Sequence, residues 1–414
     1  MIVRRTAAVL ATTAVIGTAF APAALAADSS PSPSASQAIP SGLYGSTDPT
    51  YDGVWRQSLA LLAQDTVGVE PAAKAVDWLT GQQCASGAFA PYRADATAKC
   101  DAKTMVDTNN TAAAVQALAA LGGHDTETGK AVAWLKSVQN KDGGWGYVAG
   151  GASDANSTSV VIGALTAVGE KPAAVAKGGK SPYDALLKLS IPCGADGAGA
   201  FAYQPDKKGK LAANADATAA GVLGGLGKGF TAKPGAVYDL TMCSTTDSPK
   251  ATDAAQNGAD YLAKSLEKTP YLKSALPGAK DQPDYGNTAD AVVALSAAGA
   301  TPLAKKPLAW LEKNYGAWAA KAGPAAYAQL IFAAHATGTD PRDFGGADLV
   351  KQLGATGPAA DAPGHSAVPS DEKKDEKKKD DNKGLGVWWI VGVGLVAGIG
   401  IGFLISGRNK KQQL

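Results

Sequence analysis

The sequence has little charge and no excess of either sign. Asp, Glu, Lys and Arg make up 18% of the 414 residues, and the formal net charge is +2. Nucleic-acid-binding proteins carry basic patches with interleaved aromatic residues, and no such patch occurs here. The composition therefore excludes a nucleic-acid partner. The 45% hydrophobic content leaves ample apolar surface for a core.

Cysteine and histidine are also scarce, with four and three copies. None of the histidines lies close in sequence to a cysteine, so the spacing typical of a zinc site is absent and we expect no metal. An even number of cysteines is typical of disulfides in an exported protein. Four cysteines permit three pairings, and we expect the local one, Cys84 with Cys100 and Cys193 with Cys243.

The N-terminus predicts export. Residues 1–26 combine two early arginines, an apolar run and the Ala-x-Ala cleavage site at Ala24 to Ala26, which is typical of a secretory signal peptide. Residues 27–44 are rich in Ser, Pro and Ala and predict a disordered leader.

The C-terminus predicts a membrane anchor. Residues 387–405 are uninterruptedly apolar, close to the roughly 20 residues that one membrane-spanning helix needs. Trp388 and Trp389 mark its outer boundary, and residues 406–414 form a basic tail that we expect in the cytoplasm. The charged residues 355–386 predict a disordered stalk. We therefore expect a single-pass protein of the cell membrane with its body outside the cell.

Residues 45–354 are expected to form one all-α domain. Apolar residues at helical spacing, bounded by Gly, Pro and Asn, indicate about twelve helices. Their approximate spans are 53–67, 70–83, 108–121, 128–140, 156–169, 181–190, 214–226, 253–267, 287–298, 304–314, 323–337 and 343–354.

Two classes of helix alternate along this domain. Segments such as 111–121 are almost entirely Ala, Val, Leu and Gly, whereas segments such as 128–140 have a Trp-Leu face and charged residues. A helix that is apolar all round is buried, and a helix with an apolar stripe faces water on one side. Six buried helices surrounded by six half-exposed ones predict a closed α6/α6 toroid.

A repeated sequence motif indicates a family resemblance. Lys130, Trp134 and Leu135 are followed by Gln139, Gly143 and Trp145, and a weaker copy runs from Ala75 to Phe89. This pattern resembles the QW repeat of the squalene-cyclase and protein-prenyltransferase superfamily. The resemblance implies an α/α toroid, in which the Gln and the aromatic residue tie one helix to the next.

Aromatic, Asn and Asp residues recur just ahead of the predicted buried helices. One interpretation is structural, because Asn is a good helix N-cap. The other is a ligand site at one end of the toroid, since helix N-termini attract anionic or polar ligands. The candidate ligand-binding residues are Trp145, Tyr147, Tyr203, Tyr285, Asn110, Asn156, Asn214, Asn287, Asp107, Asp154, Asp216 and Asp290.

The catalytic motifs of the family are missing. The alkene-protonating Asp-x-Asp-Asp does not occur, and Asp-Asp-x-x-Asp, which holds magnesium, is incomplete. We expect no catalytic residue and no cofactor, as in the secreted, non-catalytic transcobalamin-like toroids. The predicted function is binding of a ligand, vitamin-like or isoprenoid, or of an envelope partner. An extracytoplasmic enzyme of the terpenoid-cyclase, prenyltransferase or glycan-cleaving type and an envelope scaffold are the alternatives.

Overall fold

The computed structural model describes residues 38–237, 243–274 and 281–359. The predicted signal peptide, membrane helix and basic tail lie outside these ranges, as do most of the leader and the stalk. No helix within the described ranges is long and apolar enough to cross a membrane. The elements below all lie in the unit that begins at Ile39.

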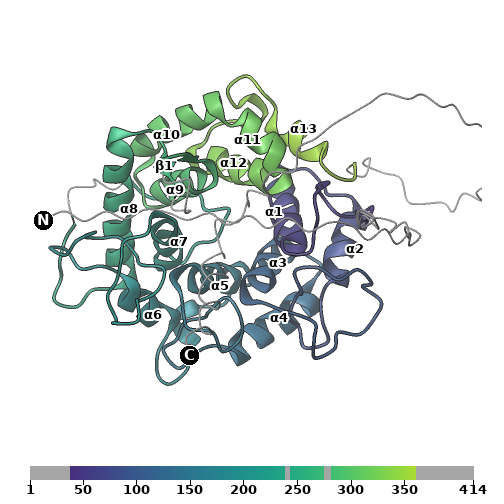
Figure 1. Ribbon diagram of the computed structural model, residues 1–414, viewed down its shortest axis with the longest axis horizontal. Helices are drawn as coiled ribbons and strands as arrows, with labels where there is room; N and C mark the ends of the chain where they lie inside the picture. Colours follow the sequence, from purple (N-terminus) through teal and green to yellow (C-terminus); the bar gives the residue numbers. More distant parts are fainter. Residues whose placement is uncertain (1–37, 238–242, 275–280, 360–414) are drawn as a thin grey trace, which may run out of the picture. The chain divides into compact units, whose positions relative to one another are not determined.

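Six helices form a closed inner ring (Figure 1). Each packs against the next, and the last packs back against the first. They are α1 (Gly53–Thr66), α3 (Thr108–Leu121), α5 (Ala155–Ala167), α7 (Ala215–Gly225), α9 (Tyr285–Ala297) and α12 (Pro324–Thr337).

Six further helices each pack on the inner helix of their own hairpin. They are α2 (Ala73–Gly81), α4 (Asp125–Ser137), α6 (Pro182–Leu189), α8 (Ala251–Lys268), α10 (Thr301–Asn314) and α13 (Leu349–Gly354). The predicted all-α toroid is therefore confirmed for the described residues.

Burial explains why the two classes of helix could be told apart. In α3 every residue from Thr108 to Leu118 is buried, whereas α4 buries only Thr128, Ala131, Val132 and Leu135. The first pattern is that of a helix surrounded by protein, and the second is the stripe of a helix facing solvent.

The structure adds elements that the sequence pattern did not predict. A short helix, α11 (Gly316–Ala322), follows α10, and its run of alanines has high intrinsic helix propensity. Strands β1 (Leu272–Lys273) and β2 (Pro283–Asp284) pair antiparallel ahead of α9. Two 3₁₀ turns, η1 (Pro172–Ala174) and η2 (Pro341–Asp343), follow α5 and α12.

The last predicted helix, 343–354, begins later than expected. Gly345 and Gly346 adopt φ values of 61° and 85°, which are left-handed and interrupt a right-handed helix. The helix therefore starts only at Leu349, with Asp348 as its cap.

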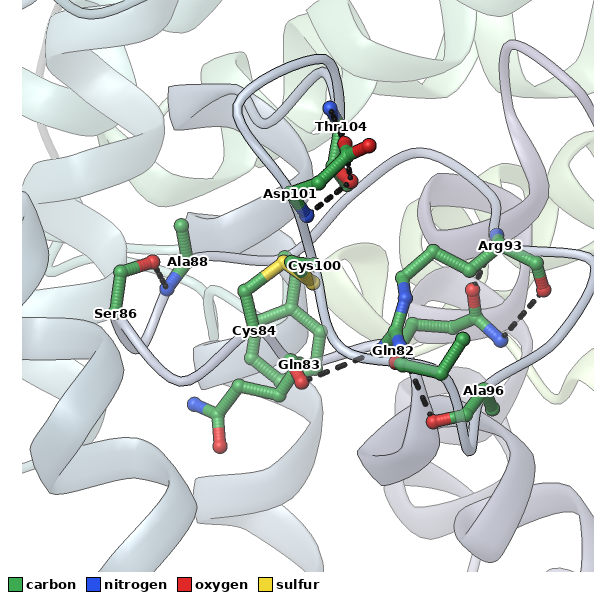
Figure 2. Close-up of a disulfide and its surroundings, with 12 residues drawn as sticks. Gln82, Gln83, Cys84, Ser86, Ala88, Arg93, Ala96, Cys100, Asp101 and Thr104 are labelled. Carbon is green, nitrogen blue, oxygen red and sulfur yellow. Dashed lines mark hydrogen bonds between the residues drawn. A yellow bond between two sulfur atoms is a disulfide. The ribbon is translucent and has the colours of Figure 1, made fainter.

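Both predicted disulfides are present. Cys84 bonds to Cys100 and Cys193 bonds to Cys243, with Cα–Cα distances of 5.6 and 5.5 Å. Figure 2 shows the first disulfide beside Arg93, whose backbone N–H donates to Gln82 Oε1 at 2.6 Å. The Cys84–Cys100 disulfide thus fastens the long loop that leads from α2 to α3.

Candidate functional site

The N-termini of consecutive inner helices lie at the same end of the ring. Thr108 N–H, the first of α3, donates to the carbonyl of Tyr147 in the loop that precedes α5. Ala155 N–H, the first of α5, donates in the same way to Tyr203 in the loop that precedes α7. Each loop therefore places the start of the helix that follows it beside the start of the previous inner helix. We call this end of the ring the mouth.

Acidic side chains cap three of the six inner helices. Asp107, Asp154 and Asp284 accept from the backbone N–H groups of Asn110, Ser157 and Asn287, and Asn214 accepts from Ala217. Of the four predicted capping asparagines, only Asn214 is a cap. Asp284, which the sequence interpretation did not single out, caps α9.

Two predicted tyrosines lie against the caps. The Tyr147 hydroxyl hydrogen-bonds to Asp107, and the Tyr203 hydroxyl hydrogen-bonds to Asp154. Burial raises the pKa of both carboxyls to about 6, despite the N–H groups they accept from. Burial and the neighbouring carboxyl raise the pKa of each tyrosine, so both phenols remain donors.

Three predicted asparagines turn an amide N–H toward a carboxyl and leave the amide oxygen unpaired. Asn110 donates to Asp107 and Asn156 to Asp216, both at 2.7 Å, and Asn287 donates to Asp284 at 2.9 Å. Among the described residues no group donates to the Oδ1 atom of any of the three.

Asp216 of α7 and Asp290 of α9 are half-buried carboxyls. Burial raises the pKa of Asp216 well above its ordinary value, and Asp290, Asp284 and Asp154 raise it further. Burial raises the pKa of Asp290 to about 7, although Gln329 of α12 donates to its carboxyl oxygens at 3.1 and 3.2 Å. Both carboxyls keep some solvent exposure while protein surrounds them.

Trp145 occupies a different environment from the other candidates. Its ring is 1% exposed, and its indole N–H donates to the Leu135 carbonyl at 2.7 Å. Gln139 donates to the carbonyls of Gly143 and Val175 at 2.8 and 3.1 Å. These contacts tie α4 to the following segments, which is the structural role implied by the QW resemblance.

Tyr285 belongs to an aromatic stack beside the mouth. Its ring lies 4.8 Å from that of Trp310 and 5.4 Å from that of Trp318, and Trp310 also contacts Tyr271 at 4.8 Å. The stack joins α9 to α10 and α11. Each ring contacts at least one other ring of the stack, so we assign the stack to packing.

A segment that the sequence interpretation missed crosses the ring interior. Residues 227–237, which we call the crossing segment, follow α7. Phe230 N–H donates to Gln116 Oε1 of α3 at 3.1 Å. The Phe230 ring packs edge-on to Trp55 of α1 at 5.6 Å and stacks on Phe332 of α12 at 6.3 Å.

Two further contacts join the crossing segment to α9 and α5. Lys228 Nζ donates to the Ala297 carbonyl of α9 at 2.9 Å. Gly163 of α5 lies so near Gly229 that a Cβ added to it would be 2.9 Å from the Gly229 Cα. Since the segment follows α7 and touches the other five inner helices, it runs through the ring. It closes the ring below the mouth, with Phe230 in the floor.

No group of three or more His, Cys, Asp or Glu in the described ranges could hold a metal ion. The carboxyls of the mouth are thus spread around the ring and share no common centre. No salt bridge of the described residues involves Asp107, Asp154, Asp216, Asp284 or Asp290.

Comparison with known proteins agrees with the fold. Residues 54–180 match the family model of the prenyltransferase alpha-alpha toroid domain. Over this segment, the match supports the predicted resemblance to the squalene-cyclase and protein-prenyltransferase superfamily. No curated protein sequence matches the chain.

Solved structures of a type II terpene cyclase, MstE from Scytonema, are similar in part. The apo form is 15% identical, with a TM-score of 0.40 over 66% of this chain and 72% of that chain. A variant of MstE in complex with geranylgeranyl dihydroxybenzoate is 14% identical, with a TM-score of 0.39 over the same shares. A likeness at this level carries no functional argument.

Proposed function

We propose that this toroid is exported, anchored in the cell membrane by one C-terminal helix, and binds a small ligand at its mouth without transforming it. The ligand enters from the N-terminal ends of the inner helices. The crossing segment, with Phe230 in the floor, limits how deeply it penetrates.

Export and anchoring are supported by three features of the chain. Two disulfides are typical of oxidising, extracytoplasmic environments. Residues 1–26 have the signal-peptide pattern, and residues 387–405 have the length and apolar character of a membrane span.

The single observation that favours binding over cyclase chemistry is the environment of Asp216. A carboxyl that protonates an alkene must be an unusually strong acid. Burial makes Asp216 a weaker acid than usual, and the adjacent carboxyls add to this effect. Asn156 is its hydrogen-bond partner, and an amide donor does not deliver a proton. The site suits hydrogen bonding to a ligand better than acid catalysis.

One alternative has support from the same residues. Glycan-cleaving enzymes pair a protonated carboxyl with an ionised one, about 5–9 Å apart. Asp290 raises the pKa of Asp216, and burial raises the pKa of Asp290 itself to about 7. A hydrolase of this kind would lose turnover, with its fold intact, when either aspartate is replaced by asparagine.

Native mass spectrometry of the full chain, expressed in its source organism and purified in mild detergent, tests the proposal. We expect a stoichiometric added mass on the wild type. Tyr203→Ala should remove it, because Tyr203 lies beside Asp154 at the mouth. The control Leu303→Ala should retain it, because Leu303 is 48% exposed on the outer helix α10. A bare wild-type mass after gentle purification would contradict the proposal.

A further inference from the structure

The crossing segment enters and leaves the ring at the end opposite the mouth. It begins just after α7, and Gly235 N–H donates at 2.9 Å to the carbonyl of Ser296 in the last turn of α9. Between these two points the Phe230 ring packs on Trp55 in the first turn of α1. Both ends of the segment therefore lie at the C-termini of inner helices, and Phe230 lies nearer the mouth.

Few contacts hold the crossing segment in place. The structure describes all of residues 227–237, and none of them is in a helix or strand. Only Ala232 among them is buried, whereas α3 is buried without a break over residues 108–118. Two backbone N–H groups, of Phe230 and Gly235, bond to the inner helices. A segment with so few buried contacts opens at a lower free-energy cost than the helices around it.

Two facing glycines make room for the segment. Gly163 lies inside α5, and a Cβ added to it would lie 2.9 Å from the Gly229 Cα and 3.0 Å from Gln116 Nε2. A Cβ added to Gly229 would overlap Gln116 Oε1. Glycine is among the least favourable residues for a helix interior. Gly163 therefore serves the contact with the crossing segment at the expense of its own helix.

We propose that the crossing segment is a gate, which withdraws from the ring as a unit while the inner helices stay folded. Withdrawal separates Phe230 from its partners on α1, α3 and α12 and leaves the hydrogen bonds within each helix intact. It gives the ring interior a second entrance, opposite the mouth. The rings of Trp55 and Phe332 and the Gln116 amide oxygen then suit an apolar ligand with one hydrogen-bond donor.

Hydrogen–deuterium exchange of the full chain in mild detergent, measured by mass spectrometry, tests the gate. Gly163→Ala introduces the best helix former and places a methyl group against the crossing segment. We expect exchange at least tenfold faster in peptides covering residues 228–237, and exchange of α5 at the wild-type rate or slower. The matched control Gly129→Ala lies in the outer helix α4, where an added Cβ meets nothing within 4 Å. It should leave exchange of the crossing segment unchanged.

A second variant places the overlap on the crossing segment itself and changes no helix. Gly229→Ala should also speed exchange over residues 228–237 at least tenfold, with α3 and α5 unchanged. Wild-type exchange of the segment in both variants would overturn the inference. So would equally faster exchange of α3 and α5, because the segment would then open only when the helices unfold. The inference is independent of ligand binding at the mouth, so neither result bears on the proposed function.

Discussion

Burying the carboxyls near the mouth costs folding free energy, and the size of this cost depends on pH. Burial raises the pKa of Asp290 to about 7 and those of Asp107 and Asp154 to about 6. A carboxyl whose pKa is raised on folding binds more protons in the folded than in the unfolded state. Stability is therefore greatest below the unfolded pKa, near 4, and falls as the pH rises through the folded value.

Replacing Asp290 by asparagine measures the part of this free-energy cost that Asp290 contributes. At pH 8 the wild type carries an ionised, poorly solvated carboxylate, and Asp290→Asn should be more stable by about 1–3 kcal/mol. At pH 5 Asp290 is protonated in the folded state, so the gain should largely vanish. Guanidinium unfolding at the two pH values measures the difference. A gain of the same size at both pH values would contradict the assigned protonation.

At the scale of elements, a repeated threonine joins each inner helix to the loop ahead of it. In four hairpins a Thr Oγ1, four residues after the cap, accepts from a buried backbone N–H of that loop. The donor and acceptor pairs, at 2.9–3.1 Å, are Phe89 and Thr111, Trp145 and Thr158, Phe201 and Thr218, and Leu272 and Thr288.

Thr218→Val tests this joint because valine keeps the shape and removes the acceptor. The Phe201 N–H would be left unsatisfied in the core, at a cost of about 1–3 kcal/mol. The control Thr80→Val removes a hydroxyl that only donates to the carbonyl of Asp77 on the surface. Thermal unfolding should show a clearly larger loss for Thr218→Val, and equal losses would show that the joint is not stabilising.

The two disulfides should differ in their effect on stability. Cys193–Cys243 spans 50 residues and Cys84–Cys100 spans 16. In the chain-entropy model the longer loop constrains the unfolded chain more, so replacing its cysteines by serine should cost about 4 kcal/mol against about 3 for the shorter one. Guanidinium unfolding midpoints of the two double variants check the order. A larger loss for the shorter loop would contradict it.

How far the elements could be predicted depends on the range of the interaction. The near-continuous burial of α3 is visible as an apolar run, and the capping of α7 by Asn214 follows from local chemistry. The Asn156–Asp216 and Asp290–Gln329 contacts join residues 60 and 39 positions apart. The crossing segment binds helices on all sides of the ring. Such pairings arise only when the ring closes, and no local pattern encodes them.

At the scale of the whole molecule, the proposed anchor makes a prediction about location. A chain ending before Val387 lacks the apolar run and should appear in the culture medium. A chain ending after Ile405 loses only the basic tail and should stay with the membrane fraction, since a span of this length is held by its own burial. Immunoblots of fractionated cells check both. Membrane retention of the shorter chain would contradict the anchor.

The central claim is that the toroid binds a ligand at its mouth and releases it chemically unchanged. The most direct measurement is to incubate the full chain with its co-purified ligand for hours, release the ligand by denaturation, and determine its mass. We predict one equivalent per chain with the starting mass at every time, and no retention by Tyr203→Ala. A product of different mass that accumulates with time, and stops accumulating in Asp216→Asn, would contradict the account and establish an enzyme.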